Sequence, residues 1–143
     1  MFDATRVLGS AVRRVYDHDA QALHNAGVDF NARDLRGDDV ARVLVAMRAT
    51  GVTRCLPTLI TSPFDAFAAS ARVLARVSDA TVAGIHMEGP YISPEDGTRG
   101  AHARGDVIPA SIEDFRRRQD AADGRIRLVT LAPEVDGALT LVE

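Results

Sequence analysis

The sequence has little of what several protein classes require. Its 143 residues include a single cysteine, Cys55, which excludes an internal disulfide and a thiolate metal cluster and is expected in the core. No apolar run approaches the roughly 20 residues of a membrane span, and the first residues lack the order of a secretory signal. The 17 basic and 20 acidic residues are interspersed, so no basic face predicts binding to nucleic acid or to a membrane. We therefore expect a cytoplasmic protein without these partners.

The residues that are present predict one α/β domain. Hydrophobic residues make up 46% of the chain, and from residue 28 onward short apolar runs alternate with stretches of helical spacing. This pattern predicts four β-α units in residues 28–143, whereas residues 1–27 carry helical spacing that is hard to interpret. The expected strands are 27–30, 53–60, 81–88 and 125–133, and the expected helices follow at 37–51, 62–77, 110–124 and from 134.

Helix starts are marked by residues that favour capping. Asp38 is the cap candidate of the first helix, and Ser62 is placed to cap the second, with Pro63 at its first helical position. Ser111 and Asp114 have the spacing of a capping box before the third helix.

The four expected β-α units make half of a closed eight-stranded barrel, and a complete small doubly wound sheet is the alternative.

The third expected strand delivers polar residues to its carboxyl end, where reacting groups collect in parallel α/β folds. Because side chains alternate along a strand, His86 and Glu88 share one face, while Ile85 and Met87 point toward the helices. A buried carboxylate is costly unless it is paired or bound to a metal. Glu88 is thus a candidate ligand for a divalent cation such as Zn²⁺, or else it caps a loop or pairs with an arginine such as Arg99 or Arg104.

The loop that follows, 89–109, is longer than the usual 2 to 6 residues of such a connection. It contains four glycines, whose backbone N–H groups can approach an anion, and His102 lies between the last two. His102 is therefore a candidate contact for a phosphate or a hydroxyl, and the alternative is an exposed loop with an incidental histidine.

Three motifs occur together, "LPTLITS" (56–62), "GIHMEGPYISPEDGTRGAH" (84–102) and "VTLAPE" (129–134). In this order and spacing they resemble the N-acetylglucosamine-6-phosphate deacetylases of the amidohydrolase superfamily, over about residues 19–143. The resemblance implies a metal-dependent (β/α)8 TIM barrel with a small β-sandwich domain, in a protein that forms homodimers. It also implies hydrolysis of N-acetylglucosamine 6-phosphate, an amino-sugar phosphate, to glucosamine 6-phosphate and acetate, with zinc or another first-row divalent metal.

The same resemblance assigns roles to individual residues. Glu88 would ligate the metal, Ala101 and His102 would contact the substrate, and His86 and Gln21 would support the site without binding the metal. The family's two metal-binding histidines and its proton-transferring aspartate would lie beyond the end of the chain, and the β-sandwich would be missing. We therefore expect a partial barrel that is inactive by itself.

Two alternatives remain open at this point. One is a metal-dependent amidohydrolase acting on a different N-acyl substrate. The other is a non-catalytic half-barrel that assembles with a partner, because half a barrel exposes sheet edges and an apolar inner face.

Overall fold

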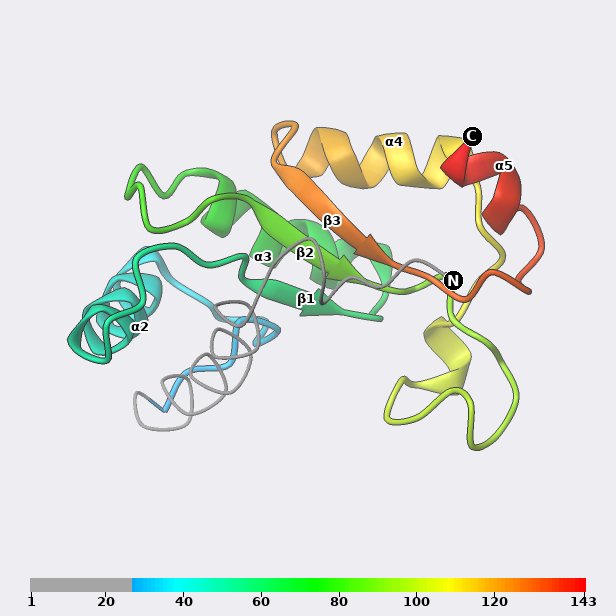
Figure 1. The fold of residues 1–143 in the computed structure, drawn as a ribbon, viewed down its shortest axis with the longest axis horizontal. Helices are drawn as coiled ribbons and strands as arrows, with labels where there is room; N and C mark the ends of the chain where they lie inside the picture. The colour runs from blue at the N-terminus through cyan, green and yellow to red at the C-terminus, as the bar shows by residue number, and fades with distance from the viewer. Residues whose placement is uncertain (1–26) are drawn as a thin grey trace.

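A computed structural model describes residues 27–143 as a mixed α/β structure with a parallel sheet (Figure 1). Residues 1–26 are outside this description, and with them the expected helical spacing of the N-terminal segment and Gln21. The elements in chain order are α2 (Gly37–Ala49), β1 (Thr58–Ile60), α3 (Phe64–Ala75), β2 (Ile85–Glu88), the 3-10 helix η1 (Arg104–Asp106), α4 (Ile112–Ala121), β3 (Ile126–Thr130) and α5 (Ala138–Val142).

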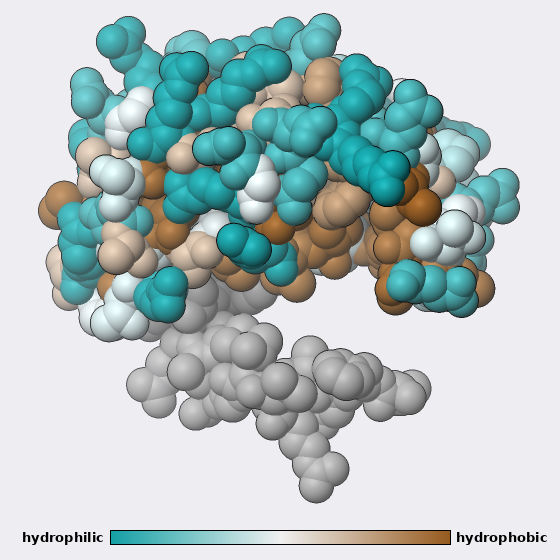
Figure 2. Space-filling model, turned by 90° about the horizontal axis from the view of Figure 1, so that it is seen from above, coloured by the Kyte–Doolittle hydropathy of each residue, from teal (hydrophilic) through white to brown (hydrophobic). Residues whose placement is uncertain are grey.

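The three strands are parallel and lie in the order β1-β2-β3, so neighbours in sequence are neighbours in space. Thr58 pairs with His86, and Glu88 pairs with both Ile60 and Thr130. In Figure 1, α3 lies behind the sheet and α4 runs beside β3. The carboxyl ends of the strands therefore meet at one edge, next to the long loop after β2. The surface in Figure 2 is largely hydrophilic, and hydrophobic residues show mainly along the lower edge of its coloured part.

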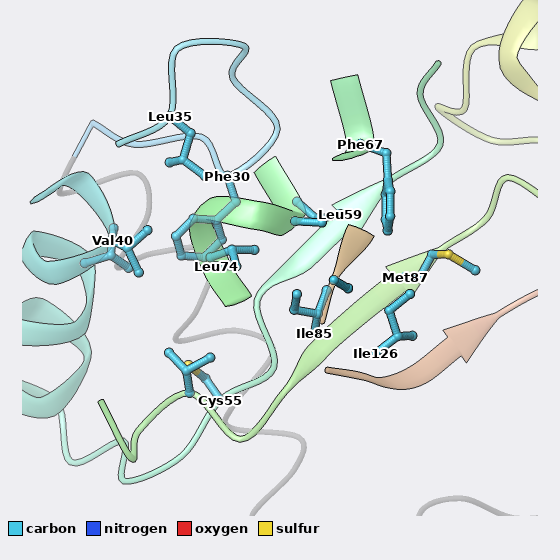
Figure 3. Close-up of a cluster of buried hydrophobic side chains, with 14 of the residues drawn as sticks. Phe30, Leu35, Val40, Cys55, Leu59, Phe67, Leu74, Ile85, Met87 and Ile126 are labelled. Atoms are coloured by element: carbon cyan, nitrogen blue, oxygen red, sulfur yellow. The ribbon is translucent and has the colours of Figure 1, made fainter. Parts of the chain in front are cut away.

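The core lies between the sheet and the helices (Figure 3). Its largest members are nearly inaccessible to solvent, and each such aliphatic or aromatic side chain contributes about 1.5–3 kcal/mol by burial. Ile85 and Met87 belong to this core, as the alternation along the third expected strand predicted, and Cys55 is buried as well. Val40, Val43, Leu44 and Met47 recur at helical spacing in the sequence, and all four are buried on α2.

The strand expected at 27–30 is wrong, because the structure places turns there. The side chain of Asn31 accepts a hydrogen bond from the Ile60 N–H at 2.9 Å and donates to the Thr58 carbonyl at 3.5 Å. The Asn31 side-chain amide thus forms hydrogen bonds with β1 backbone groups that a neighbouring strand would otherwise bind. Hydrophobic periodicity in the sequence cannot predict that a side chain forms these bonds in place of a strand.

The strands are also shorter than predicted. The run 53–60 yields β1 and an isolated bridge between Cys55 and Val82. Between these two pieces lies Pro57, which has no N–H to donate to a ladder. In the same way 81–88 shortens to β2, which begins beside a register shift at Ile85, and 125–133 shortens to β3.

The caps agree with prediction in one helix of three. Asp38 does not cap α2; the helix starts after Arg36, whose N–H donates to the Asp39 carboxylate at 3.0 Å. Ser62 does not cap α3 either, because that helix starts one residue later, after Pro63. Ser111 does cap α4, with its hydroxyl accepting from the Asp114 N–H at 3.3 Å. The Asp114 carboxylate binds elsewhere, as described below, so the second half of that capping box is not formed.

The carboxyl end of α3 is closed by a side chain from the start of β3. Arg125 donates hydrogen bonds at 2.7 to 3.2 Å to the carbonyls of four residues, Leu74, Ala75, Val77 and Val82. The Leu74 carbonyl also accepts from the Val77 N–H at 3.2 Å. The last carbonyls of a helix otherwise lack backbone partners, so a cationic donor there both satisfies them and complements the helix dipole.

Candidate functional site

The candidate site lies where the carboxyl ends of β1 and β2 meet the long loop. Glu88 is the last residue of β2 and is half-buried, and Thr61 directly follows β1 and is 7% exposed. Gly89 leaves the strand with a φ of 77°, and a Cβ atom at this position would collide with the Thr61 hydroxyl. Only glycine combines this backbone conformation with so close an approach.

His86 joins the three strands to one another. Its Nδ1 lies 3.0 Å from the Thr58 hydroxyl on β1, and its Nε2 lies 2.8 Å from the Thr130 hydroxyl on β3. Burial lowers the pKa of His86, against a smaller raising effect of the Glu88 carboxylate, and the ring is 2% exposed. A neutral ring can donate through one nitrogen and accept through the other. His86 therefore supports the sheet directly beneath Glu88, with both nitrogens already engaged.

The described residues do not complete a metal site. Among residues 27–143, no group of three or more histidine, cysteine, aspartate or glutamate side chains is arranged to hold an ion. Glu88 offers a carboxylate, but the nitrogens of His86 contact threonine hydroxyls. A catalytic zinc normally takes three protein ligands. The donors present in this part of the chain therefore do not fit a catalytic metal by themselves.

The arginine alternative for Glu88 is also not realised in the described part of the chain. Arg99 forms its salt bridge with Asp96 at 2.5 Å and donates to the His102 carbonyl at 2.6 Å. None of the ion pairs among residues 27–143 includes Glu88 or Arg104.

His102 reaches back to the strand ends through Thr61. The His102 Nδ1 lies 2.8 Å from the Thr61 hydroxyl, which in turn contacts the Glu88 carbonyl oxygen at 3.3 Å. The structure thus connects the loop histidine to the residue expected to bind a metal, through one intervening side chain. Ala101 is exposed in the turn that precedes His102.

The loop is anchored at its start by a buried polar network. The Tyr91 hydroxyl donates to the Asp114 carboxylate at 2.8 Å, and Arg118 donates to the same oxygen at 2.7 Å. Burial raises the pKa of Tyr91, and the hydrogen bond to Asp114 raises it further, so the phenol stays protonated. Arg118 also lies over the ring of Phe67, with its guanidinium carbon 5.0 Å from the ring centre. This network ties the beginning of the loop to α4 and α3.

The sequence analysis did not predict a role for two residues at the strand ends, Thr61 and Asn31. Thr61 stands inside the motif "LPTLITS", and its signal is a hydroxyl placed directly after a buried strand. Asn31 gives no comparable signal, because its role depends on which strand edge it meets in space.

Comparisons with known proteins identify relatives of the chain. No family model matches the chain. The chain is 35% identical over 127 residues to the N-acetylglucosamine-6-phosphate deacetylase of Bos taurus, a match covering 82% of this chain and 30% of that protein. It is 30% identical over 141 residues to the N-acetylgalactosamine-6-phosphate deacetylase of Escherichia coli, covering 90% of this chain and 37% of that protein. The chain therefore spans about three tenths of the length of the relatives it matches.

A solved structure gives the same result for the fold. The N-acetyl-D-glucosamine-6-phosphate deacetylase of Mycobacterium smegmatis, in complex with N-acetyl-D-glucosamine-6-phosphate, superposes with a TM-score of 0.72 at 34% identity. This match covers 82% of this chain and 30% of the solved one. Over the stretch that it shares with these proteins, the chain belongs to the N-acetylglucosamine-6-phosphate deacetylase family.

Proposed function

We propose that this chain contributes to the deacetylation of an N-acetylated amino-sugar 6-phosphate, with Glu88 as a metal ligand and Ala101 and His102 as substrate contacts. The observation that carries the proposal is the connection of His102 to Glu88 through Thr61. It joins a residue suited to bind a metal and a residue suited to bind a sugar at one edge of the sheet. The names of the relatives support this substrate class.

The metal, zinc or another first-row divalent ion, would need further ligands from outside residues 27–143. Carboxylate oxygen suits such ions, and Glu88 would supply one ligand while His86 holds the strand beneath it. Residues 27–143 supply too few donors to hold a catalytic metal by themselves.

For the fold, we propose that the three strands are part of a (β/α)8 barrel. The homodimer and the β-sandwich domain are proposed only for the full-length proteins of the family. The order β1-β2-β3 is that of neighbouring strands around a barrel, although one half of a doubly wound sheet has the same order, and the likeness to the solved deacetylase structure supports the barrel.

Binding of the sugar phosphate tests the substrate assignment directly. The chain is titrated with N-acetylglucosamine 6-phosphate, its galactosamine epimer and unphosphorylated N-acetylglucosamine, while amide resonances are followed by NMR. We expect shifts at Ala101, His102 and Glu88 with the phosphorylated sugars. His102→Asn should weaken binding about tenfold, which corresponds to one hydrogen bond of about 1.4 kcal/mol. Thr98→Val, in the same loop, is the matched control. Unchanged resonances at these positions would show that the substrate assignment is wrong.

Acetate release in the presence of Zn²⁺ tests the role of Glu88. If ligands from outside residues 27–143 complete the site, Glu88→Gln should abolish acetate release. Glu95→Gln, an exposed carboxylate in the loop, should leave the rate unchanged. Activity that survives Glu88→Gln would contradict the ligand role.

The non-catalytic half-barrel is a second candidate, favoured by the exposed side of the sheet. Within residues 27–143, β3 pairs only with β2, and Leu128 on β3 is 41% exposed. Sugar phosphate binding without acetate release, together with a defined dimer in sedimentation, would support this candidate.

A further inference from the structure

Arg99 is the residue around which the middle of the long loop folds. Its guanidinium group donates from Nη1 to the His102 carbonyl at 2.6 Å and from Nη2 to the Asp96 carboxylate at 2.5 Å. Its backbone N–H donates to the Glu95 carbonyl at 2.9 Å, so Arg99 binds residues on both sides of it in the sequence. Arginine is mostly exposed in proteins, but this side chain is only 19% exposed. The loop therefore encloses its own arginine.

Gly100 allows the chain to return to the Arg99 side chain. Its φ is 60°, and a Cβ atom at this position would meet no atom within 4 Å. Space is thus not the reason for a glycine here; the left-handed backbone is, because other residues rarely adopt it. This reversal brings the His102 carbonyl back to the guanidinium group three residues earlier.

The contacts of the guanidinium group differ in strength. The Asp96 side chain is 77% exposed, so water and salt screen its ion pair with Arg99. The bond to the His102 carbonyl is short and has a cationic donor, which makes it the stronger of the two. The Nε atom of Arg99 is buried and has no hydrogen-bond partner among residues 27–143, and such a donor opposes folding. The side chain therefore adds little net stability, and its main effect is to fix the backbone at His102.

We propose that Arg99 is a positioning residue, which fixes the backbone of residues 101 and 102 and so places Ala101 and His102 for the sugar phosphate. This step rests on the proposed function, in which these two residues are substrate contacts. The planar fork of arginine reaches two acceptors at once, whereas the ammonium group of lysine is a point charge on a flexible stem. A pair of residues that is already held in place loses less conformational freedom when a ligand binds.

The contact can be observed in the whole chain without any ligand. In a sample labelled with ¹³C and ¹⁵N, a scalar coupling across the hydrogen bond should join an Arg99 Nη nitrogen to the His102 carbonyl carbon. We also expect the Nη1 protons to exchange slowly with solvent. Arg99→Lys identifies these signals by their loss. A guanidinium group that shows no coupling and exchanges as fast as that of exposed Arg104 would overturn the proposal.

Substitutions separate positioning from a general structural role. Arg99→Lys keeps the charge but loses the fork, so it should shift the amide resonances of Ala101 and His102. It should also weaken binding of N-acetylglucosamine 6-phosphate about tenfold, as for the loss of one hydrogen bond, while the urea midpoint of unfolding stays close to that of the native chain. Arg104→Lys, at an exposed position in the same loop, is the matched control and should change none of these quantities. A lower urea midpoint with unchanged affinity would show that Arg99 has only a structural role.

Asp96→Asn tests which contact of Arg99 matters. This variant removes the ion pair and leaves the bond to the His102 carbonyl, so affinity should fall less than in Arg99→Lys. An equal loss in both variants would contradict positioning through the carbonyl. If Arg99→Lys does not fold, the coupling in the native chain still decides whether the contact exists. The proposed function fails separately, because a chain that shows the coupling but binds no sugar phosphate refutes the substrate assignment and leaves the Arg99 contact standing.

Discussion

Removal of one hydroxyl, by Tyr91→Phe, should measurably destabilise the chain. Tyr91 is fully buried, and its hydroxyl donates to the Asp114 carboxylate at 2.8 Å. Phenylalanine keeps the ring, so no cavity larger than the oxygen remains. A hydrogen bond to a charged group contributes about 1.5–3 kcal/mol. Asp114 keeps its contact with Arg118, so we expect a loss near the lower end, about 1.5–2 kcal/mol.

The single cysteine provides the assay. Cys55 is buried, so its thiol should react with a probe mainly when the chain opens, and urea unfolding followed this way gives the free energy. The double-mutant cycle with Asp114→Asn isolates the pair and should show a coupling of about 1 kcal/mol. A loss below about 0.5 kcal/mol, as at surface positions, would show that this network does not anchor the loop. A loss above about 4 kcal/mol would show that the ring itself had moved.

Three further changes have directions set by the structure. Arg125→Met should cost about 2–3 kcal/mol in urea unfolding by removing the Arg125 donor from the carbonyls of Ala75, Val77 and Val82, whereas exposed Arg127→Met should cost under about 0.5 kcal/mol; equal losses would refute this reading. Gly89→Ala should lower the free energy of unfolding by at least about 1–2 kcal/mol, because residue 89 has a left-handed backbone conformation. The added methyl group should displace Thr61 and so shift the NMR resonances of His102; unchanged His102 resonances would contradict the contact. Hydrogen bonds from Thr81 and from Arg48 hold the pKa of Asp79 at about 2, below its ordinary 3.8. The unfolded chain therefore binds more protons than the folded one between these values, and the stability from Asp79 is present above about pH 4 and lost toward pH 2. Asp79→Asn should flatten that part of the stability profile, and an unchanged slope would be inconsistent with the shift.

The sequence alone determined the class of fold and the family. Alternating apolar runs and helical spacing predicted a parallel α/β structure, and the helices α2, α3 and α4 lie within the ranges expected for them. Three motifs in fixed order identified the family, which the relatives and the solved structure confirm. These features could be predicted because they depend on local periodicity and on residue types at fixed spacing. The placement of Glu88 at the end of β2 belongs here too, since alternation along a strand is a local rule.

The tertiary structure decided which groups meet. Thr61 and His102 are 41 residues apart, and their contact exists because the loop folds back over the ends of β1 and β2. Asn31 replaces an expected strand because its amide happens to face an open edge of β1. The Asp114 carboxylate leaves its predicted cap because a buried tyrosine and a buried arginine bind it more strongly than one backbone N–H. Such competition between partners is settled only when distant segments are packed together, and no spacing along the chain encodes it.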